Sequence, residues 1–431
     1  MDVAVSASAN RVTRALEEGL RAIVTPKFVR QASVADAVAG VLPQIVAEPA
    51  TEQELAKVLK LADEAGLAVI PRGGGTKVDW GNPPGRADLI LSTLRLNRIL
   101  EHAWADLTVT VEAGCTIGKL QGALAKHGQR LALDALWPEH ATVGGMLSTN
   151  DSGALRLRFG SLRDLIIGVT LALPDGTLAS SGGKVVKNVA GYDLPKLATG
   201  ALGTLGVITR AVFRVHPLPK ETCTLTCICD DAAEAQRLVL AVQDSKLAHS
   251  ALQIRCGGKA QPRVDVLFEA TQAGLAAQTE QLKSIARNII FLDSNSEVWN
   301  ARQGLYSAVK ADGANFAIVK FSTLPGQPAN TIGALTSLCA DAVRWSAVVQ
   351  ATGIGCVCLQ GQGPAIESAL RSLRRNLEGT EGSLVVHHPP AAVCRMEAWG
   401  DAGDALPLMR AVKQQLDPKN TLNPGRFVGG I

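Results

Sequence analysis

The hydrophobic pattern of the first half of the chain predicts alternating helices and strands. Apolar residues recur at helical spacing in residues 12–23, which are predicted to form an amphipathic helix. Helices are also predicted at 52–65 and 116–127, because Thr51 and Thr116 are N-cap candidates and Gly66 and Gly128 end the two segments. Thr51 with Glu54 forms a predicted capping box for the second helix. Short apolar and β-branched runs between these helices predict strands at 41–46, 67–70, 89–91, 108–112, 165–173, 177–180, 207–209 and 211–215.

The pattern changes after the sequence His216-Pro217-Leu218-Pro219, and we predict a domain boundary there. Strands are predicted at 224–229, 264–269, 317–321, 356–360 and 383–388. Helices are predicted at 232–244, 275–288, 330–340 and 365–376. This alternation indicates a second α+β unit with a mostly antiparallel sheet over residues 220–405. Residues 1–35 are predicted to be a helical lead, and residues 406–431 a helix with a polar tail.

A glycine-rich stretch at 182–210 stands out from these elements. Gly200, Gly203 and Gly206 recur at every third residue before the β-branched run 207–209. Glycine at this density costs chain entropy unless the backbone turns sharply or approaches something closely. From this stretch alone, a ligand-binding loop and a glycine-rich bulge or hairpin without a ligand are both compatible.

A second glycine cluster, PRGGGTK at 71–77, directly follows the strand predicted at 67–70. Successive backbone amides in such a loop can form a nest for an anion, and Arg72 or Lys77 could add charge-assisted bonds to a pyrophosphate. The cluster is not the P-loop that ends in Gly-Lys-Ser/Thr, because Thr76 precedes Lys77. It is not the Rossmann fingerprint either, since no helix opens on these glycines.

A third cluster lies at 142–153, with the sequence TVGGMLSTNDSG. Gly144 and Gly145 lead into a helix-like run at 146–149, and Asn150, Asp151 and Ser152 follow. Small hydroxyl and amide side chains between glycines can bond the heteroatoms of a ring without filling its space.

Composition narrows the function classes. The chain has 431 residues, 47% apolar and 19% charged, and a net charge of +4 with dispersed basic residues, so it lacks the electrostatic footprint of a nucleic-acid-binding protein. The nine cysteines include no Cys-x-x-Cys motif, and pairs such as Cys227 and Cys229 are predicted to be buried apolar residues of strands. We find no secretory leader and no apolar run of about 20 residues. These features predict a soluble, cytoplasmic protein with no transmembrane segment.

Six segments in order resemble the FAD-binding oxidoreductases of the vanillyl-alcohol oxidase / p-cresol methylhydroxylase (PCMH) type. Within this family, the chain is similar to the FAD-binding subunit of bacterial glycolate oxidase. Each segment is unspecific alone, and the ordered set is specific. The segments are PRGGGT (71–76), TVGGMLSTNDSG (142–153), RFGSLRDLIIGVTLALPDG (158–176), KNVAGYDL (187–194), GTLGVIT (203–209) and LDPKNTLNPGRF (416–427).

The resemblance implies an α+β fold, with a two-subdomain PCMH-type FAD-binding domain over residues 36–219 and an α+β cap or substrate domain over 220–405. Residues 406–431 would return to the FAD domain. It implies three groups of cofactor-binding residues along the FAD molecule. The pyrophosphate would be held by Arg72, Gly73, Gly74, Gly75 and Thr76. The flavin and ribityl side would be lined by Gly144, Gly145, Thr149, Asn150 and Gly153, and the adenine end would meet the main chain of Gly206, Val207 and Ile208. Thr142 is also expected to bind the cofactor, as are Arg158 and Gly160, which fall in the matching arginine–aromatic–glycine segment.

Two departures from relatives refine this expectation. PRGGGTK carries no His or Cys for a covalent flavin bond, so noncovalent FAD is expected, with His140 and Cys115 as residues that could change this. The metal-binding motif HxGDGNxH of some relatives does not occur. His387 and His388 are adjacent on a predicted strand, where they would face opposite ways, so no metal site is expected.

The leading expectation is therefore an FAD-dependent oxidoreductase acting on CH–OH groups, as the FAD-binding subunit of a glycolate-type 2-hydroxyacid oxidising complex. Its partners would be a small 2-hydroxyacid, a sister flavoprotein subunit and an iron–sulfur subunit. Cap cations such as Lys320, Arg344 or Arg395 could bind a carboxylate, and no catalytic base is assigned. Two alternatives stay open: a stand-alone flavin oxidase or dehydrogenase that uses the cap histidines, and a non-catalytic FAD-binding assembly subunit.

Overall fold

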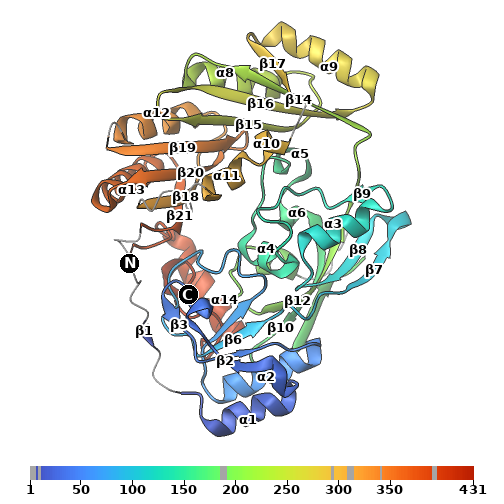
Figure 1. The fold of residues 1–431 in the computed structure, drawn as a ribbon, viewed down its shortest axis with the longest axis vertical. Coiled ribbons are helices and arrows are strands. Elements are labelled where there is room, and N and C mark those ends of the chain that lie inside the picture. Colours follow the sequence, from blue (N-terminus) through green and yellow to red (C-terminus); the bar gives the residue numbers. More distant parts are fainter. Residues whose placement is uncertain are drawn as a thin grey trace. The chain divides into compact units, whose positions relative to one another are not determined.

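A computed structural model describes residues 6–7, 11–184, 192–292, 296–307, 315–339, 342–390 and 396–431 (Figure 1). By its internal contacts the chain divides into two compact units. Unit 1 comprises Met1–Asp151, Ser161–Leu218 and Asp401–Ile431, and unit 2 comprises Ser152–Gly160 and Pro219–Gly400.

The first sheet of unit 1 has four strands in the order β2-β4-β6-β5. The strands are β2 (Val29–Gln31), β4 (Ile45–Ala47), β6 (Leu89–Ser92) and β5 (Val69–Arg72). β4, β6 and β5 run parallel, and β2 is antiparallel to β4. Val69 of β5 also forms a parallel bridge with Leu422 near the C-terminus. The glycine loop at 73–77 therefore leaves the carboxyl end of a parallel strand, where open α/β sheets commonly bind ligands.

The second sheet of unit 1 has five strands in the order β11-β10-β12-β8-β7, and every neighbouring pair is antiparallel. The strands are β11 (Leu178–Gly182), β10 (Ile166–Ala172), β12 (Val207–Arg214), β8 (Thr108–Glu112) and β7 (Ile99–Ala103). Two short pairs complete the strands of this unit: β1 (Ser6–Ala7) with β3 (Val41–Leu42), and β9 (Gln129–Arg130) with β13 (His216–Pro217).

The helices of unit 1 pack on these two sheets. The helices are α1 (Arg14–Ile23), α2 (Glu52–Glu64), α3 (Ile117–Ala125), α4 (Val143–Thr149), α6 (Leu162–Leu165), α7 (Leu194–Ala198) and α14 (Leu406–Leu416). Leu20 of α1 and Leu59 of α2 join one apolar core with the four-stranded sheet. Leu120 of α3 and Met146 of α4 join another core with the five-stranded sheet.

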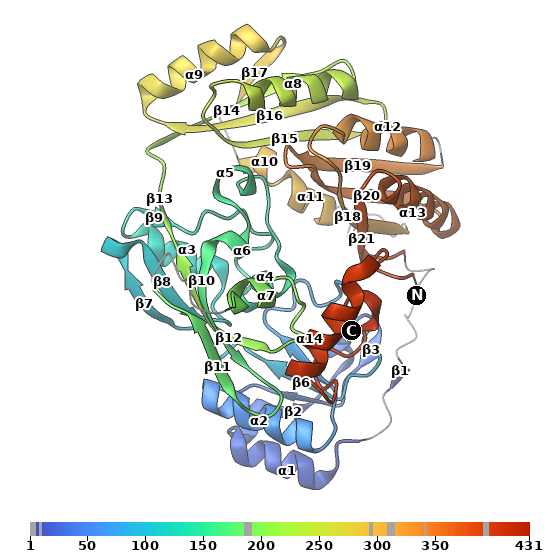
Figure 2. The same ribbon diagram turned by 180° about the vertical axis from the view of Figure 1, so that it is seen from behind.

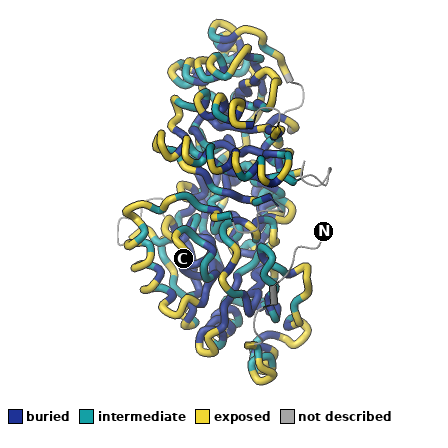
Figure 3. Tube along the Cα trace, turned by 90° about the vertical axis from the view of Figure 1, so that its left-hand side faces the viewer, coloured by how far each residue is buried: buried dark blue, intermediate teal, exposed yellow. Residues whose placement is uncertain are grey.

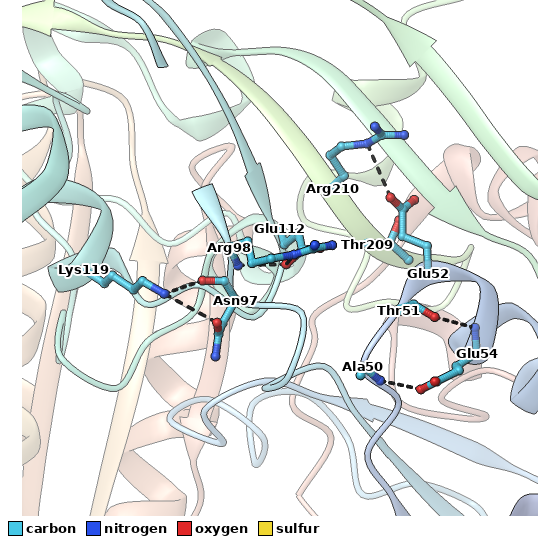
Figure 4. A network of polar contacts seen from close by, with 10 residues as sticks. All are labelled: Ala50, Thr51, Glu52, Glu54, Asn97, Arg98, Glu112, Lys119, Thr209 and Arg210. Carbon is cyan, nitrogen blue, oxygen red and sulfur yellow. Dashed lines mark hydrogen bonds and ion pairs between the residues drawn. The ribbon is translucent and has the colours of Figure 1, made fainter. Parts of the chain in front are cut away.

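Polar contacts tie α2 to the five-stranded sheet (Figure 4). The Glu52 carboxylate accepts a hydrogen bond from Thr209 Oγ1 at 3.1 Å and lies 3.7 Å from Arg210 Nε of β12. Thr51 caps α2 as predicted, because its hydroxyl accepts from the Glu54 amide at 3.1 Å. The predicted capping box is wrong in its second half: the Glu54 carboxylate accepts from the Ala50 amide at 2.7 Å.

Unit 2 is built on one eight-stranded sheet in the order β17-β14-β16-β15-β19-β20-β18-β21, and every neighbouring pair is antiparallel (Figure 2). The antiparallel sheet is therefore confirmed. The strands are β14 (Glu221–Ile228), β15 (His249–Gly257), β16 (Ala260–Ala270), β17 (Ile289–Leu292), β18 (Phe316–Ser322), β19 (Val343–Gln350), β20 (Ile354–Gly361) and β21 (Ser383–His388). The sequence pattern did not predict β15, β17 or β19.

Helices cover both faces of this sheet. α8 (Ala232–Asp244), α9 (Gln272–Ile285), α12 (Pro328–Cys339) and α13 (Gly363–Glu378) bury one face with residues such as Val239 and Leu373. α11 (Ala301–Ser307) packs Leu305 on the other face, next to the short α10 (Ser296–Trp299). Figure 3 shows the buried residues inside the units and exposed ones along the outer turns of the helices.

Residues 152–160, which include α5 (Arg156–Phe159), differ from the expected domain limits. The sequence assigned them to the domain at 36–219, whereas their contacts are with the eight-stranded sheet. Ala154 packs with Ala251 and Leu267, and Arg158 Nη1 donates to the Ala248 carbonyl at 3.3 Å. This apolar contact explains why the segment belongs to unit 2.

Candidate functional site

A cavity in unit 1 is lined by all three glycine-rich clusters and by the C-terminal segment. It encloses about 710 Å³, a volume that includes its opening to solvent. The lining residues are Pro71–Val78, Thr93, Thr142, Gly144, Gly145, Ser148, Thr149, Leu202, Gly203, Gly206, Val207, Ile208, Asn423 and Arg426.

The loop after β5 contributes four backbone N–H groups to this cavity. Within the described ranges, the amides of Gly73, Gly74, Gly75 and Thr76 donate to no protein acceptor. Gly73 and Thr76 are half-buried, and Gly74 and Gly75 are exposed, so these four donors are open to a ligand or to solvent at the cavity wall. Successive amides of this kind form the anion-binding concavity called a nest.

The glycines of this loop are explained by close approach of the chain to itself. A Cβ at Gly73 would lie 2.1 Å from Thr142 Oγ1, and a Cβ at Gly74 would lie 1.8 Å from the His140 carbonyl oxygen. Gly75 has a φ of +72°, which disfavours residues with a side chain. The absence of side chains thus lets the loop pack against the start of α4.

The backbone amides at the N-terminus of α4, in contrast, donate to acceptors within the protein. Val143 and Gly144 donate their amides to the carbonyls of Cys115 and Ala113 at 2.9 and 2.8 Å. Gly145 donates to the N-cap hydroxyl of Thr142 at 3.3 Å. At this cavity wall the amides without a protein acceptor are therefore those of the 73–76 loop, in contrast to those at the start of α4.

Arg72 reaches the cavity wall held by a buried carboxylate. Arg72 Nη2 donates to Asp36 Oδ1 at 2.9 Å, and Asp36 also accepts two hydrogen bonds from Arg30 at 2.7 and 2.8 Å. The Arg30 guanidinium, with further hydrogen bonds from Ser33 and Arg72, holds the pKa of the Asp36 carboxyl well below its usual range. Asp36 is therefore ionised at neutral pH, and its carboxylate fixes the orientation of the Arg72 side chain.

Lys77 is a second cation of the wall, and it is buried. Its ammonium lies 3.5 Å from Asp151 Oδ2 and 3.2 Å from Met146 Sδ. It also lies 5.6 and 5.5 Å from the ring centroids of Trp80 and Trp137, within cation–π range. These contacts hold a positive charge between the 73–76 loop and α4.

Two residues of the C-terminal segment complete the wall. Asn423 Nδ2 donates to the Leu202 carbonyl at 2.5 Å. Arg426 donates to the carbonyls of Trp80, at 2.7 Å, and of Val78. Burial lowers the pKa of Arg426 to about 10, so it is charged at neutral pH.

The structure brings most of the sequence-predicted residues together. Those that line the cavity are Arg72, Gly73, Gly74, Gly75, Thr76, Thr142, Gly144, Gly145, Thr149, Gly206, Val207 and Ile208. Asn150 follows Thr149 at the C-cap of α4 with a φ of 45° and is not part of the lining. Gly153, Arg158 and Gly160 belong to unit 2. Residues 185–191 of the glycine-rich stretch at 182–210 lie outside the described part of the chain.

Sequence reasoning assigned no role to six of the lining residues: Val78, Thr93, Ser148, Leu202, Asn423 and Arg426. The segment LDPKNTLNPGRF carried a signal for the last two, since it matched the family pattern, but no role was assigned to its side chains. Neither Cys115 nor His140 is among the lining residues, and noncovalent binding of the cofactor stays a prediction. The Cys115 thiol is buried and lies 3.6 Å from the Thr116 carbonyl.

The histidines of unit 2 do not form a recognisable metal site. His387 is buried, and its Nδ1 is 2.9 Å from the Tyr306 hydroxyl. His388 is exposed and lies with its ring on Phe316. Among the residues with described positions, no group of three or more His, Cys, Asp or Glu side chains is arranged to hold a metal ion.

The sequence matches two protein families. Residues 43–182 match the family described as FAD binding domain, and residues 398–427 match the C-terminal domain of FAD linked oxidases. The chain therefore carries an FAD-binding domain and the C-terminal domain of FAD linked oxidases. FAD is therefore its cofactor, and the recognition of the family from six ordered segments is confirmed.

Curated relatives and solved structures agree with these two domain matches. The glycolate oxidase subunit GlcD of Bacillus subtilis is 29% identical over 57% of this chain, and the match spans 52% of that protein. A mitochondrial D-lactate dehydrogenase (cytochrome) of Arabidopsis thaliana is 24% identical over 90% of this chain and 74% of that protein. The structure of p-cresol methylhydroxylase with substrate bound aligns with a TM-score of 0.77 at 14% identity, covering 98% of this chain and 97% of that chain. This likeness confirms the α+β PCMH-type fold.

The residues present fit FAD. The cofactor carries a pyrophosphate, and the 73–76 loop offers four amides without protein acceptors among the described residues, next to cations at Arg72, Lys77 and Arg426. In the described part of the chain, no helix is both long and apolar enough to span a bilayer.

Proposed function

We propose that unit 1 holds FAD in the cavity described above. The 72–76 segment would bind the pyrophosphate through its amides, α4 with Gly144, Gly145 and Thr149 would line the flavin and ribityl side, and Gly206–Ile208 would meet the adenine end. The four amides of the 73–76 loop are the observation that carries this assignment. Roles for Asn150, Gly153, Arg158 and Gly160 stay predictions.

We further propose that the chain oxidises, or takes part in oxidising, the CH–OH group of a small 2-hydroxyacid. Two relatives are named for glycolate and D-lactate, both of which are 2-hydroxyacids. Bound FAD supplies the acceptor for the two electrons that leave the substrate carbon. The chain's own residues fix the cofactor: Asp36 holds Arg72 in place, and Asp151 holds Lys77.

The proposal includes an assembly with other subunits. The Bacillus subtilis relative is named as a subunit. A sister flavoprotein subunit and an iron–sulfur subunit are the partners expected for a glycolate-type complex, and they remain predictions, as does a cytoplasmic location. Unit 2 offers Lys320 and Arg344 as cations for a carboxylate, while Arg395 lies outside the described residues.

One observation favours the stand-alone alternative. The half-buried Tyr306 hydroxyl and the buried His387 ring of unit 2, joined at 2.9 Å, form a hydrogen-bonded pair of the type that moves a proton in general acid–base catalysis. In that case the isolated chain would oxidise a 2-hydroxyacid without other subunits. A non-catalytic assembly subunit would instead bind FAD and never reduce it.

Anaerobic addition of glycolate or D-lactate to the purified, FAD-loaded chain tests these proposals. Loss of the 450 nm flavin band with either acid would support an active subunit, and its loss in wild type but not in His387→Asn would favour the stand-alone enzyme. A flavin that is bleached only when a sister subunit is added would support the complex. A chain that retains no FAD after reconstitution would refute the cofactor site.

A further inference from the structure

The C-terminal segment 413–426 makes side-chain contacts with two backbone stretches of the cavity wall that lie far away in the sequence. Asn423 donates to the Leu202 carbonyl, 221 residues away, and Lys413 donates to the Thr204 carbonyl, 209 residues away, at 2.9 Å. Arg426 donates to the carbonyls of Val78 and Trp80. Leu202, Gly203 and Val78 line the cavity, so this segment controls the position of its wall.

The stretch at 202–203 needs such support, because its backbone is strained. Leu202 has a φ of 49°, and Gly203 follows with a φ of 67°. A leucine in the left-handed region is an uncommon conformation that persists only where surrounding contacts enforce it. The Leu202 amide is held by the Ser148 carbonyl of α4 at 2.8 Å, and its carbonyl is held by Asn423.

Lys413 locks the segment itself. Its ammonium makes three hydrogen bonds: to Asp417 Oδ2 at 2.5 Å, to the Leu422 carbonyl at 2.9 Å and to Thr204. Burial lowers the pKa of Lys413, while the neighbouring Asp417 opposes this shift. Asp417 in turn accepts from the amides of Thr421 and Leu422, both at 2.8 Å. All three ammonium protons are therefore used in one buried arrangement that joins α14, the tail and the 202–204 loop.

We propose that the segment 413–426 is a clamp whose side chains hold the strained 202–204 loop in its cofactor-binding conformation, with Asn423 as the main positioning residue. This inference rests on the proposed FAD site. Its consequence is thermodynamic coupling: FAD binds the clamped form, so weakening the clamp weakens FAD binding, and bound FAD protects the clamp from opening.

The chain supplies a matched pair of variants. Asn423 and Asn420 both belong to the segment, and both adopt left-handed backbone conformations, with φ values of 47° and 55°. Glycine accepts this conformation, so Asn423→Gly removes the amide side chain without backbone strain. Asn420→Gly makes the same change at an exposed position that does not line the cavity.

Two readouts test the clamp. FAD affinity of the apo-protein is measured by quenching of flavin fluorescence, and amide hydrogen exchange is followed at Leu202–Leu205 in the apo-protein. Asn423→Gly is expected to raise the FAD Kd at least tenfold and to speed exchange at Leu202–Leu205, since the buried Leu202 carbonyl loses its donor. Asn420→Gly is expected to change neither by more than about twofold. Lys413→Met, at the other anchor of the loop, is expected to act like Asn423→Gly.

The outcomes separate this inference from the proposed function. Unchanged affinity and exchange in Asn423→Gly, or equal losses in Asn420→Gly, would overturn the clamp. A wild-type chain that binds no FAD would refute the proposed cofactor site, and faster exchange confined to Asn423→Gly would still support the clamp. If Lys413→Met lacks a native circular dichroism spectrum, the Asn423/Asn420 pair decides.

Discussion

Replacing Gly74 with alanine is the sharpest test of the 73–76 loop. The new Cβ would lie 1.8 Å from the His140 carbonyl oxygen and 2.9 Å from its carbon. A backbone carbonyl cannot rotate away as the end of a long side chain can. Contacts under 3.0 Å are essentially not observed for Cβ atoms, so the loop and residue 140 must separate by at least 3.0 − 1.8 = 1.2 Å.

This displacement is large on the scale of a hydrogen bond. Amides that bind at about 2.9 Å lose most of the interaction when displaced by more than 1 Å. Hydrogen bonds to charged acceptors contribute about 1.5–3 kcal/mol each. Loss of two of the four loop contacts therefore costs about 3 kcal/mol or more, which corresponds to a rise of at least ~100-fold in Kd.

The assay is an FAD fluorescence titration of the apo-protein, with two companion variants. Gly122→Ala lies in α3 with no atom within 4 Å of the new Cβ, and it is expected to leave the Kd unchanged. Gly75→Ala meets only the Arg72 side chain, at 3.9 Å, but its φ of +72° adds about 1–2 kcal/mol of strain, so an intermediate loss is expected. A Gly74→Ala protein that binds FAD within threefold of wild type would refute the assignment of the loop.

Three further predictions address other parts of the molecule. Asp36→Asn is expected to destabilise the protein by about 2 kcal/mol at pH 7, a value reduced for the half-exposed Arg30 partner. Because the pKa of Asp36 is depressed in the folded state, its contribution to stability is complete above about pH 5 and fades below about pH 4. The urea unfolding midpoints of variant and wild type should therefore converge in acid. A constant difference down to pH 3 would contradict this reasoning. Burial raises the pKa of Cys227 to about 12 and of Cys229 to about 11, so mass spectrometry should find both unmodified after iodoacetamide treatment of the native protein at pH 8 and alkylated after denaturation; rapid native labelling would be the contrary result. Gly355→Ala would place a Cβ 2.2 Å from the buried Phe321 ring, so calorimetry should show unit 2 destabilised by about 1–3 kcal/mol with the FAD Kd unchanged, and an unaltered melting profile would refute the packing argument.

Local signals predicted the helices of unit 1 well, because their N-caps act within a single turn. Thr51 and Thr116 accept from the amides three residues on, as their positions in the sequence indicate. The strand β15 escaped prediction for a tertiary reason. Ser250 and Gln253 are buried in β15, and Gln253 bonds to Asp265, so polar residues occupy positions that a simple pattern assigns to solvent. Partners on other strands decide that burial.

The same distinction explains what was found and missed at the cavity. The glycine clusters at 71–76, 142–153 and 203–208 can be recognised from composition alone, and residues of all three line the cavity. Asn423 and Arg426 look like ordinary polar residues of a tail, and their role depends on carbonyls more than 200 residues away. The residues next to Asn423 and Arg426 in the sequence therefore do not indicate which carbonyls they contact. The family resemblance predicted that the tail returns to the FAD-binding domain, but it did not predict which atoms the side chains of the tail contact.

The glycines themselves have a different meaning in the structure from the one that the sequence indicates. A dense glycine run predicts close approach to a ligand, yet the Cβ positions of Gly73, Gly74 and Gly144 are blocked by Thr142, His140 and Ala113 of the protein. These glycines assemble the wall by letting the β5 loop, α4 and β8 pack together. In the proposed site, the ligand contacts would come from the amides at 73–76, which this packing leaves without a protein acceptor. Substitutions at Gly74 therefore act on FAD indirectly, by moving donors, and this is why the size of the clash, rather than contact with the cofactor, sets the magnitude predicted above.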